Sequence, residues 1–412
     1  MIYYGLTWRP STDNLGDDLV SLAAMQRLPR VDMALDADAL DTPLPGLQDD
    51  DRVVLLSPGL FLRSSAHWPP EKHIVPVCVG VHISEEDAWG LPVSTLDGAG
   101  LVALTACAPI AARDVRTAKR LTKLNIPHTL TGCLSLTLEH ANVPRKGVVC
   151  CDVPDEVVTA IRGFCRDVTI TTHEMNSPSP DFTLRMENAK ALLTQYASAE
   201  MVFTRRLHCA MACLAVGTPV LLLYHPEYED NTRFAPMDDM VRKQPVDDFL
   251  RELQAHGMPA PWRNPADVGA IRRRMLTSLA EGLRRAETQP LPIVPEDSAI
   301  LWKQERIRLM MKTAATKIQT LEQQHYDDLH QKFTQLVLEE DVKSTLEELL
   351  TLPEVENALR AASLRLKLAK LPPKEHKALL ATHKRNLLDV DDLIRKANGA
   401  LLQLGWPENN DD

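Results

Sequence analysis

The chain has 412 residues, enough for two or three domains of ordinary size and a substantial core. Hydrophobic residues make up 44% and charged residues 25%, as in a typical soluble globular protein, and the formal net charge is −10. This charge, with no strongly basic domain, argues against nucleic acid as a partner. No apolar run reaches the roughly 20 residues that span a bilayer, so we expect no transmembrane segment.

The first residues and the cysteines predict a cytoplasmic protein. The N-terminal stretch lacks the basic region and apolar run of a signal peptide. The eight cysteines show neither the spacing of a disulfide framework nor that of a zinc site. We therefore expect reduced cysteines that serve as small core residues, and no bound metal.

The first 145 residues alternate short apolar runs with stretches of helical periodicity. The runs predict buried strands at 51–59, 73–83 and 100–109. The periodic stretches predict helices at 15–28 and 115–126. Strands that alternate with helices predict an α/β layer with a mostly parallel sheet, here a first domain over 1–145.

A second alternation follows and predicts another α/β domain over 146–290. Its strands are expected at 147–154, 167–173, 200–204 and 218–225, and its helices at 155–165, 187–198 and 207–217. Two such blocks facing each other would form a cleft. Ligands of open α/β sheets bind beyond the carboxyl ends of the strands, so we expect functional residues there.

The composition changes beyond two proline-rich joints at 261–268 and 289–298. Apolar residues then recur every three or four positions from 307 to 336, which predicts a long helix with one apolar stripe. We expect 291–412 to be an all-helical extension. It would serve as a seam between copies of the chain or as a surface for a partner protein, or it would pack against the α/β body.

The strongest motif is TRRLHCAM, at 204–211, where an apolar strand runs into an apolar helix. A helix N-terminus presents free backbone N–H groups, and Arg205 and Arg206 would add forks for phosphate or carboxylate. A bound anion would favour a protonated His208, which could then act as a general acid. Solvated arginines beside a half-buried histidine are the alternative.

Three further positions follow predicted strands. In DNLGDDLV, at 13–20, Asn14 and Asp17 would contact an acceptor hydroxyl, although the spacing alone favours a plain helix cap. His82 ends an apolar run, where a packed histidine is the commoner outcome. Arg113 precedes a potential cap, Asp114, and would form either a surface ion pair or an anion clamp.

Common catalytic signatures are absent from the sequence. There is no GxxxxGK[ST], GxGxxG, GxSxG or HExxH. The sequence therefore argues against triphosphate hydrolysis, dinucleotide binding, α/β-hydrolase chemistry and zinc proteolysis.

The ordered motifs resemble the polysaccharide pyruvyl transferase family over roughly 1–240. They are DNLGDD, SPGLF, VGVHI, ARDVRTAKRLTKLNI, TGCLSLTL and VFTRRLHCAMACLAVGTPVLLL. Leu134 stands where the family usually has proline. The resemblance implies two Rossmann-like domains facing across a cleft, similar to B-type glycosyltransferases.

The resemblance also implies a reaction. A pyruvyl group passes from phosphoenolpyruvate to a sugar hydroxyl of a polysaccharide or its precursor, and phosphate leaves. It assigns His208 as the acid, Arg113 and Arg206 as the donor clamp, and His82 as an orienting group or base. No metal or cofactor is required.

Two other functions stay open. One is transfer from a nucleotide-sugar on the same scaffold, with RRLH binding the diphosphate. The other is a scaffold protein without catalysis, whose helical extension binds a partner. A pocket that brings Arg113, Arg206 and His208 together would favour an enzyme, and an apolar slot for a base would favour the nucleotide-sugar.

Overall fold

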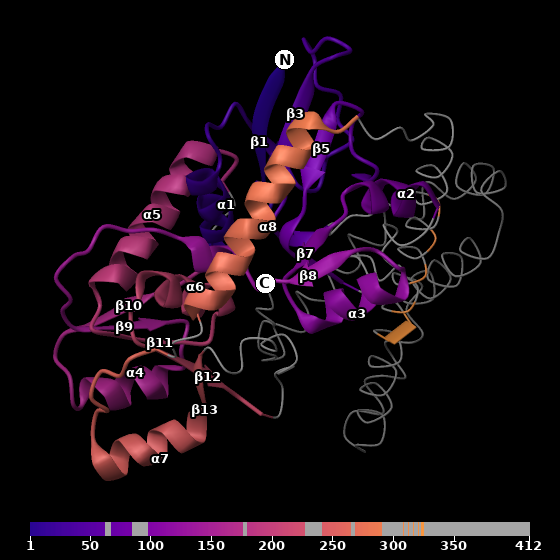
Figure 1. Cartoon of the computed structure of the whole chain (residues 1–412). Helices are drawn as coiled ribbons and strands as arrows, with labels where there is room; N and C mark the ends of the chain where they lie inside the picture. Colours follow the sequence, from indigo (N-terminus) through magenta and orange to yellow (C-terminus); the bar gives the residue numbers. More distant parts are fainter. Residues whose placement is uncertain are drawn as a thin grey trace, which may run out of the picture. The chain divides into compact units, whose positions relative to one another are not determined.

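The structure is a computed structural model. It describes residues 1–61, 67–84, 98–175, 179–226, 241–264 and 268–290, with single helical positions at 308, 312, 316, 320, 323 and 324. The chain divides into two compact units, Met1–Ala315 and Thr316–Asp412. Every element below belongs to the first unit (Figure 1). The predicted extension at 291–412 otherwise lies outside the described residues, and the boundaries predicted at 145 and 290 stay predictions.

Two four-stranded sheets form the N-terminal block. The first has the order β2 (Met33–Asp36), β1 (Ile2–Trp8), β3 (Arg52–Leu56) and β5 (Ile74–Val77). The second has the order β4 (Gly59–Phe61), β6 (Val79–Ile83), β7 (Ile110–Ala112) and β8 (His128–Leu130). All pairs in both sheets are parallel, as the alternation of strands and helices predicted.

One predicted strand was wrong. The run at 100–109 forms helix α2 (Gly98–Ala106) and the turn after it. Its buried residues, Gly100, Ala103 and Leu104, follow helical spacing, whereas Val102 is 54% exposed. A short apolar run fits a buried strand and a buried helix equally well, so its periodicity did not decide between them.

The predicted helices on either side of the N-terminal sheets are confirmed. Helix α1 (Leu15–Arg27) begins at the cap Asn14, whose Oδ1 accepts a hydrogen bond from the Gly16 N–H at 2.9 Å. Helix α3 (Val115–Lys123) begins at the cap Asp114. A 3₁₀ turn, η3 (Leu134–Thr137), is fully buried.

A five-stranded parallel sheet forms the second block. Its order is β10 (Val168–Thr171), β9 (Val148–Cys151), β11 (Met201–Thr204), β12 (Val220–Tyr224) and β13 (Arg242–Pro245). Its helices are α4 (Asp155–Arg162), α5 (Phe182–Ser198), α6 (Leu207–Val216) and α7 (Val246–His256). The last described helix is α8 (Val268–Thr288), which packs on β3, β5 and β6 of the first block (Figure 1). These elements confirm the second predicted alternation.

The two blocks share one continuous core. Helix α1 of the first block packs against α5 and α6 of the second, and η3 joins the same cluster. A buried ion pair lies in this contact: Arg185 of α5 donates to both carboxylate oxygens of Asp18 of α1, at 2.8 to 3.0 Å. The contact places the start of α1 beside the start of α6. Within the described part of the chain, no helix is both long and apolar enough to cross a bilayer.

Candidate functional site

A pocket of about 300 Å³ lies where several strands end. Its described lining consists of Asn14, Arg113, Asp152, His173, Arg205, Arg206, Leu207 and His208. These residues follow β7, β9, β10 and β11 or begin α1 and α6. Strands β9, β10 and β11 are parallel neighbours that end at the same edge of one sheet, and β7 belongs to another sheet whose strand end reaches the same pocket. The pocket therefore combines residues from both α/β blocks.

The first turn of α6 opens into this pocket. Arg206 occupies the N-cap position, and no side chain of the described residues caps the helix there. The Arg206 N–H itself bonds to the Thr204 hydroxyl at 2.9 Å. Leu207 and His208 form the first turn and line the pocket. The free N–H groups of such a turn, with their partial positive charge, favour an anion.

The approach of α1 to His208 requires glycine at position 16. A Cβ atom on Gly16 would lie 2.8 Å from His208 Nδ1 and 2.9 Å from both His173 Nδ1 and Asn14 Oδ1. Asn14 therefore both caps α1 and lines the pocket. Asp17 Oδ1 lies 4.0 Å from His208 Nδ1, and its other oxygen accepts a hydrogen bond from the Thr12 hydroxyl.

Arg206 is held by two carboxylates. Its Nε donates to Asp152 Oδ2 at 2.7 Å, and its Nη2 donates to Glu174. Burial raises the pKa of Asp152, but hydrogen bonds from Thr172 and the His173 N–H and the charge of Arg206 outweigh burial and lower it. Arg206 thus enters the pocket as part of an ion-pair network, with two of its donor groups already engaged.

His82 and Arg113 share one carboxylate partner. His82 Nδ1 lies 2.5 Å from Asp114 Oδ2, and Arg113 Nε lies 3.6 Å from the same oxygen. The other oxygen of Asp114 accepts from the Thr117 N–H at 2.9 Å and so caps α3. Burial raises the pKa of Asp114, but the bonds from His82 and Thr117 and the charge of Arg113 lower it to about 2. This carboxylate is therefore ionised at neutral pH.

The structure brings four of the six predicted site residues into the pocket lining: Asn14, Arg113, Arg206 and His208. Asp17 and His82 lie outside that lining. Asp17 lies 4.0 Å from the lining residue His208, whereas His82 contacts Asp114, which in turn lies 3.6 Å from the lining residue Arg113. Three other lining residues, Asp152, His173 and Leu207, were not predicted, and the eighth, Arg205, was named only as an anion fork within the RRLH motif. Asp152 and His173 follow the carboxyl ends of β9 and β10, so the same rule that selected Arg113 could have found them.

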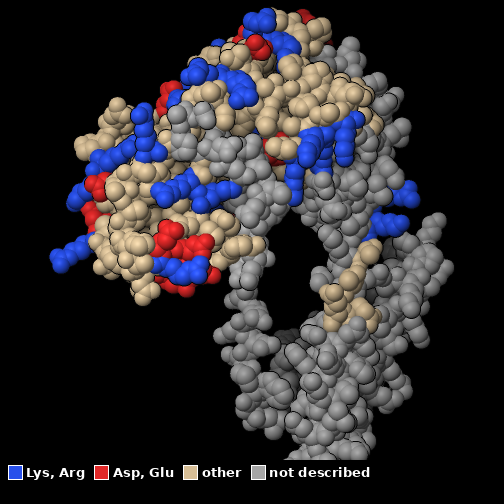
Figure 2. Space-filling view, turned by 60° about the horizontal axis from the view of Figure 1, so that its bottom comes forward, with Lys and Arg blue, Asp and Glu red and all other residues tan. Residues whose placement is uncertain are grey.

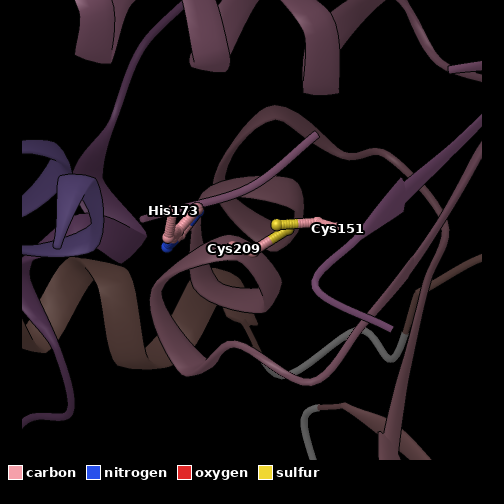
Figure 3. Close-up of side chains that lie close together, drawn as sticks. All are labelled: Cys151, His173 and Cys209. Atoms are coloured by element: carbon pink, nitrogen blue, oxygen red, sulfur yellow. The ribbon is translucent and has the colours of Figure 1, made fainter. Parts of the chain in front are cut away.

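A cluster of buried side chains lies under the pocket (Figure 3). One ligand atom from each of Cys151, His173 and Cys209 lies within 4.8 Å of the others, so these three could hold a metal ion. The Tyr196 hydroxyl bonds to His173 Nε2 at 2.8 Å and lies 3.4 Å from Cys151 Sγ. Its hydrogen bond with Cys209 and its burial raise the pKa of the Cys151 thiol far above the ordinary range. Sequence spacing gave no signal of this group, because its members come from three different elements.

One flank of the described body is basic. Figure 2 shows lysine and arginine side chains gathered at the right of the view, on the side where α3 lies in Figure 1. Helix α3 exposes Arg116, Lys119 and Lys123. The same helix begins next to Arg113, so this surface borders the strand end that supplies the pocket.

Comparison with known proteins identifies a family for the central part of the chain. Residues 100–227 match the family model of the polysaccharide pyruvyl transferases. The match confirms the resemblance over this segment, whereas the motifs DNLGDD, SPGLF and VGVHI lie before it, and the matched family is a family of transferases. The matched segment contains Arg113, Asp152, His173 and the whole RRLH motif.

Other comparisons add little to the family match. No curated protein matches the chain. Among solved structures, an uncharacterized protein from Klebsiella pneumoniae subsp. pneumoniae NTUH-K2044 is 11% identical, over 59% of this chain and 92% of its own, with a TM-score of 0.35. A similarity at that level carries no inference, so the α/β assignment rests on the parallel sheets themselves.

Proposed function

We propose that this chain transfers a pyruvyl group from phosphoenolpyruvate to a sugar of a polysaccharide or of its precursor. The observation that carries the proposal is the pocket itself. Three arginines and His208 line it at the uncapped start of α6, inside the segment that matches the pyruvyl transferase family. We also propose that residues 1–145 and 146–290 act as two Rossmann-like halves, because both contribute residues to this pocket.

The lining suits a small donor with two anionic groups. Phosphoenolpyruvate carries a carboxylate and a phosphate, and arginine forks bind both kinds of group in a bidentate manner. In our proposal Arg113 and Arg205 bind the donor directly, with the N–H groups of α6. Arg206, held by Asp152 and Glu174, supplies charge and keeps the others in position.

The proposed reaction proceeds by acid catalysis. His208 donates a proton to the enol methylene of phosphoenolpyruvate, and the neighbouring carbon becomes oxocarbenium-like. Two hydroxyls of the sugar form the two new C–O bonds of the ketal at that carbon, and the bond to the phosphate oxygen breaks. One hydroxyl proton restores His208 and the other leaves with phosphate, so atoms and charges balance. The arginines stabilise the charge on the departing phosphate.

His82 and Asp114 complete the proposed machinery. The ionised carboxylate of Asp114 holds Nδ1–H of His82, which leaves Nε2 as the acceptor nitrogen. In this state His82 would accept the proton of one attacking hydroxyl and pass it to the departing phosphate. His82 lies outside the described lining of the pocket, so this role requires an acceptor that extends past Arg113.

A nucleotide-sugar transferase is the second candidate. Only one apolar residue, Leu207, belongs to the described lining, whereas a nucleotide base needs an apolar slot. A pocket of about 300 Å³ also lies at the small end of ligand sites. Both observations favour the smaller, purely anionic donor. A scaffold without catalysis is disfavoured because Arg113, Arg206 and His208 line one pocket.

Donor binding tests the proposal. Purified full-length protein would be titrated with phosphoenolpyruvate and with a panel of nucleotide-sugars, and binding followed by calorimetry and by thermal stabilisation. We expect heat and stabilisation with phosphoenolpyruvate, abolished in Arg113→Ala and retained in Arg116→Ala, which removes an exposed arginine of α3.

A second assay tests the transfer step. Phosphate release would be measured with phosphoenolpyruvate and a panel of saccharides. Binding of a nucleotide-sugar alone would replace the proposal with glycosyl transfer. No binding of any donor, with or without saccharide, would contradict both enzymatic functions.

A further inference from the structure

We propose that Cys151, His173 and Cys209 form a binding site for Zn²⁺ or a similar thiophilic cation directly under the pocket. One ligand atom of each residue lies within 4.8 Å of the others. Figure 3 shows the two sulfur atoms side by side, with the imidazole of His173 next to them. This inference does not depend on which donor the pocket binds.

The parallel sheet brings the three residues together. Cys151 is the last residue of β9, and its register partners are Thr171 of β10 and Thr204 of β11. His173 follows β10 by two residues, and Cys209 lies in the first turn of α6, shortly after β11. Three adjacent strand ends therefore each supply one ligand. All three side chains are buried, with 0 to 1% exposed.

The donor set matches what zinc selects. Two thiolates and one imidazole are the ligands of a Cys₂His site, and three protein ligands leave one position open. With Zn–S bonds of about 2.3 Å and Zn–N bonds of about 2.0 Å, tetrahedral ligand atoms stand roughly 3.5 Å apart. The three ligand atoms lie within 4.8 Å of one another, so they would have to move closer by roughly 1 Å at most to reach this spacing.

The surroundings of His173 orient it toward the cluster. Its Nε2 faces the buried side, since it bonds to the Tyr196 hydroxyl. Its Nδ1 lies on the side of Gly16 and the pocket. The Tyr196 hydroxyl also lies 3.4 Å from Cys151 Sγ, so a metal bound to Nε2 would replace the hydrogen bond between His173 and Tyr196.

Charge balance suits a buried site. Two thiols would release two protons to solvent as Zn²⁺ binds, and two thiolates with a neutral imidazole leave the complex uncharged. A neutral complex avoids the cost of an isolated buried charge. His173 lines the pocket, which provides a path from solvent to the site.

The metal would hold the pocket rather than react in it. Asp152 and His208 line the pocket, and each is next in sequence to a proposed ligand, Cys151 and Cys209 respectively. The backbone N–H of His173 also bonds to Asp152 at 2.9 Å. One ion would therefore tie together the ends of β9 and β10 and the start of α6, and its loss would loosen the residues that Arg206 and His208 depend on.

Cobalt spectroscopy on the wild-type chain tests the site directly. Reduced protein would be titrated with Co²⁺ and then with Zn²⁺ against a chromophoric chelator. We expect one metal per chain, a thiolate-to-cobalt absorption band and its loss when Zn²⁺ is added. An absent band overturns the proposal, as does a Cys151–Cys209 disulfide that persists under reducing conditions.

Three variants localise the site. Cys209→Ser and His173→Gln should weaken Zn²⁺ binding by at least about 100-fold, since loss of a direct ligand exceeds the cost of losing a group that supports one. Cys150→Ser is the matched control, because Cys150 is equally buried but packs in a different core cluster. If a variant fails to fold, the thiolate-to-cobalt band of the wild-type protein still tests whether the chain binds the metal through cysteine. Equal affinity in Cys209→Ser and wild type, or loss of binding in Cys150→Ser alone, would place the metal elsewhere.

Discussion

Two connections from a strand to a helix carry arginines, and the helices that follow them begin differently. Between β7 and α3, the start of the helix is closed by Asp114, whose carboxylate accepts the Thr117 N–H. Between β11 and α6, Arg206 stands at the cap position without a side-chain hydrogen bond to the first turn. Both arginine-bearing joints reach the same pocket, through Arg113 and through Arg205 and Arg206.

The difference separates a structural helix start from one available to a ligand. At α3 the helix dipole is already matched by a carboxylate, which also holds His82 and attracts Arg113. At α6 no side chain of the described residues caps the first turn, and the carboxylates of Asp152 and Glu174 bind the side chain of Arg206. We infer that an external anion binds at α6 and that α3 supplies fixed partners for it. The following substitutions test this contrast, beginning with the largest expected effect.

His208→Ala removes the proposed acid at the open helix start. We expect turnover to fall by about 10²–10⁴-fold, because protonation of the enol methylene loses its donor. Thermal unfolding should stay close to that of the wild type. His256→Ala, which removes an exposed histidine of α7, is the control. Unchanged turnover would exclude His208 as the acid, and an unfolded variant would assign it a structural role.

Asp114→Asn tests the closed helix start. Asparagine still caps a helix, so the substitution mainly removes the carboxylate charge. The folded-state pKa of about 2 lies below the ordinary value of 3.8, so the ionised carboxylate stabilises the fold above about pH 4. This contribution, at most about 2 kcal/mol, is lost as the pH falls toward 2.

Urea unfolding across this pH range measures the contribution of Asp114. Wild type should exceed the variant at pH 7, and the difference should shrink in acid. A difference that is independent of pH would show that the charge of Asp114 does not stabilise the fold.

Arg113→Lys tests whether the arginine beside the closed start binds the donor. Lysine keeps the charge but lacks the planar fork, so we expect phosphoenolpyruvate affinity to fall about tenfold, which is ~1.4 kcal/mol. Calorimetric titration measures the effect. Lys119→Arg, a reverse exchange on the exposed face of α3, should leave affinity unchanged. Full affinity in Arg113→Lys would remove the clamp role.

Charge reversal on the exposed face of α3 should have the smallest effect. Lys119→Glu and Lys123→Glu alter the basic flank without touching the described pocket lining. We expect donor affinity to fall by less than about fivefold, because exposed charges contribute at most ~1 kcal/mol. The effect should vanish at high salt, where screening is strong. A larger effect that persists in salt would mean that this flank contacts the substrate directly.

Local pattern predicted most elements of the α/β body, but it failed where the pattern was ambiguous. Helices α1 and α3 begin at their capping residues, and α6 follows its apolar run. Helix α2 was taken for a strand, because a short run that is apolar on all sides has no distinguishing period. For the candidate site, Arg113 and His208 were predicted from their places after strands, and the structure places both in the pocket lining. Asn14 lies beside the start of α6 because helix α1 packs against helix α6, and this contact could not be predicted from local pattern.

The sequence by itself determined the RRLH motif, the resemblance of its segment to a transferase family and its position at the start of a buried helix, because these depend on neighbouring residues. Only the tertiary structure decided which strand ends meet. It gave Arg206 its two carboxylates, paired His82 with Asp114, and gathered Cys151, His173 and Cys209 under the pocket. Contacts of this kind come from sheet order and register, which are set by packing across the whole unit and leave no local periodicity in the chain.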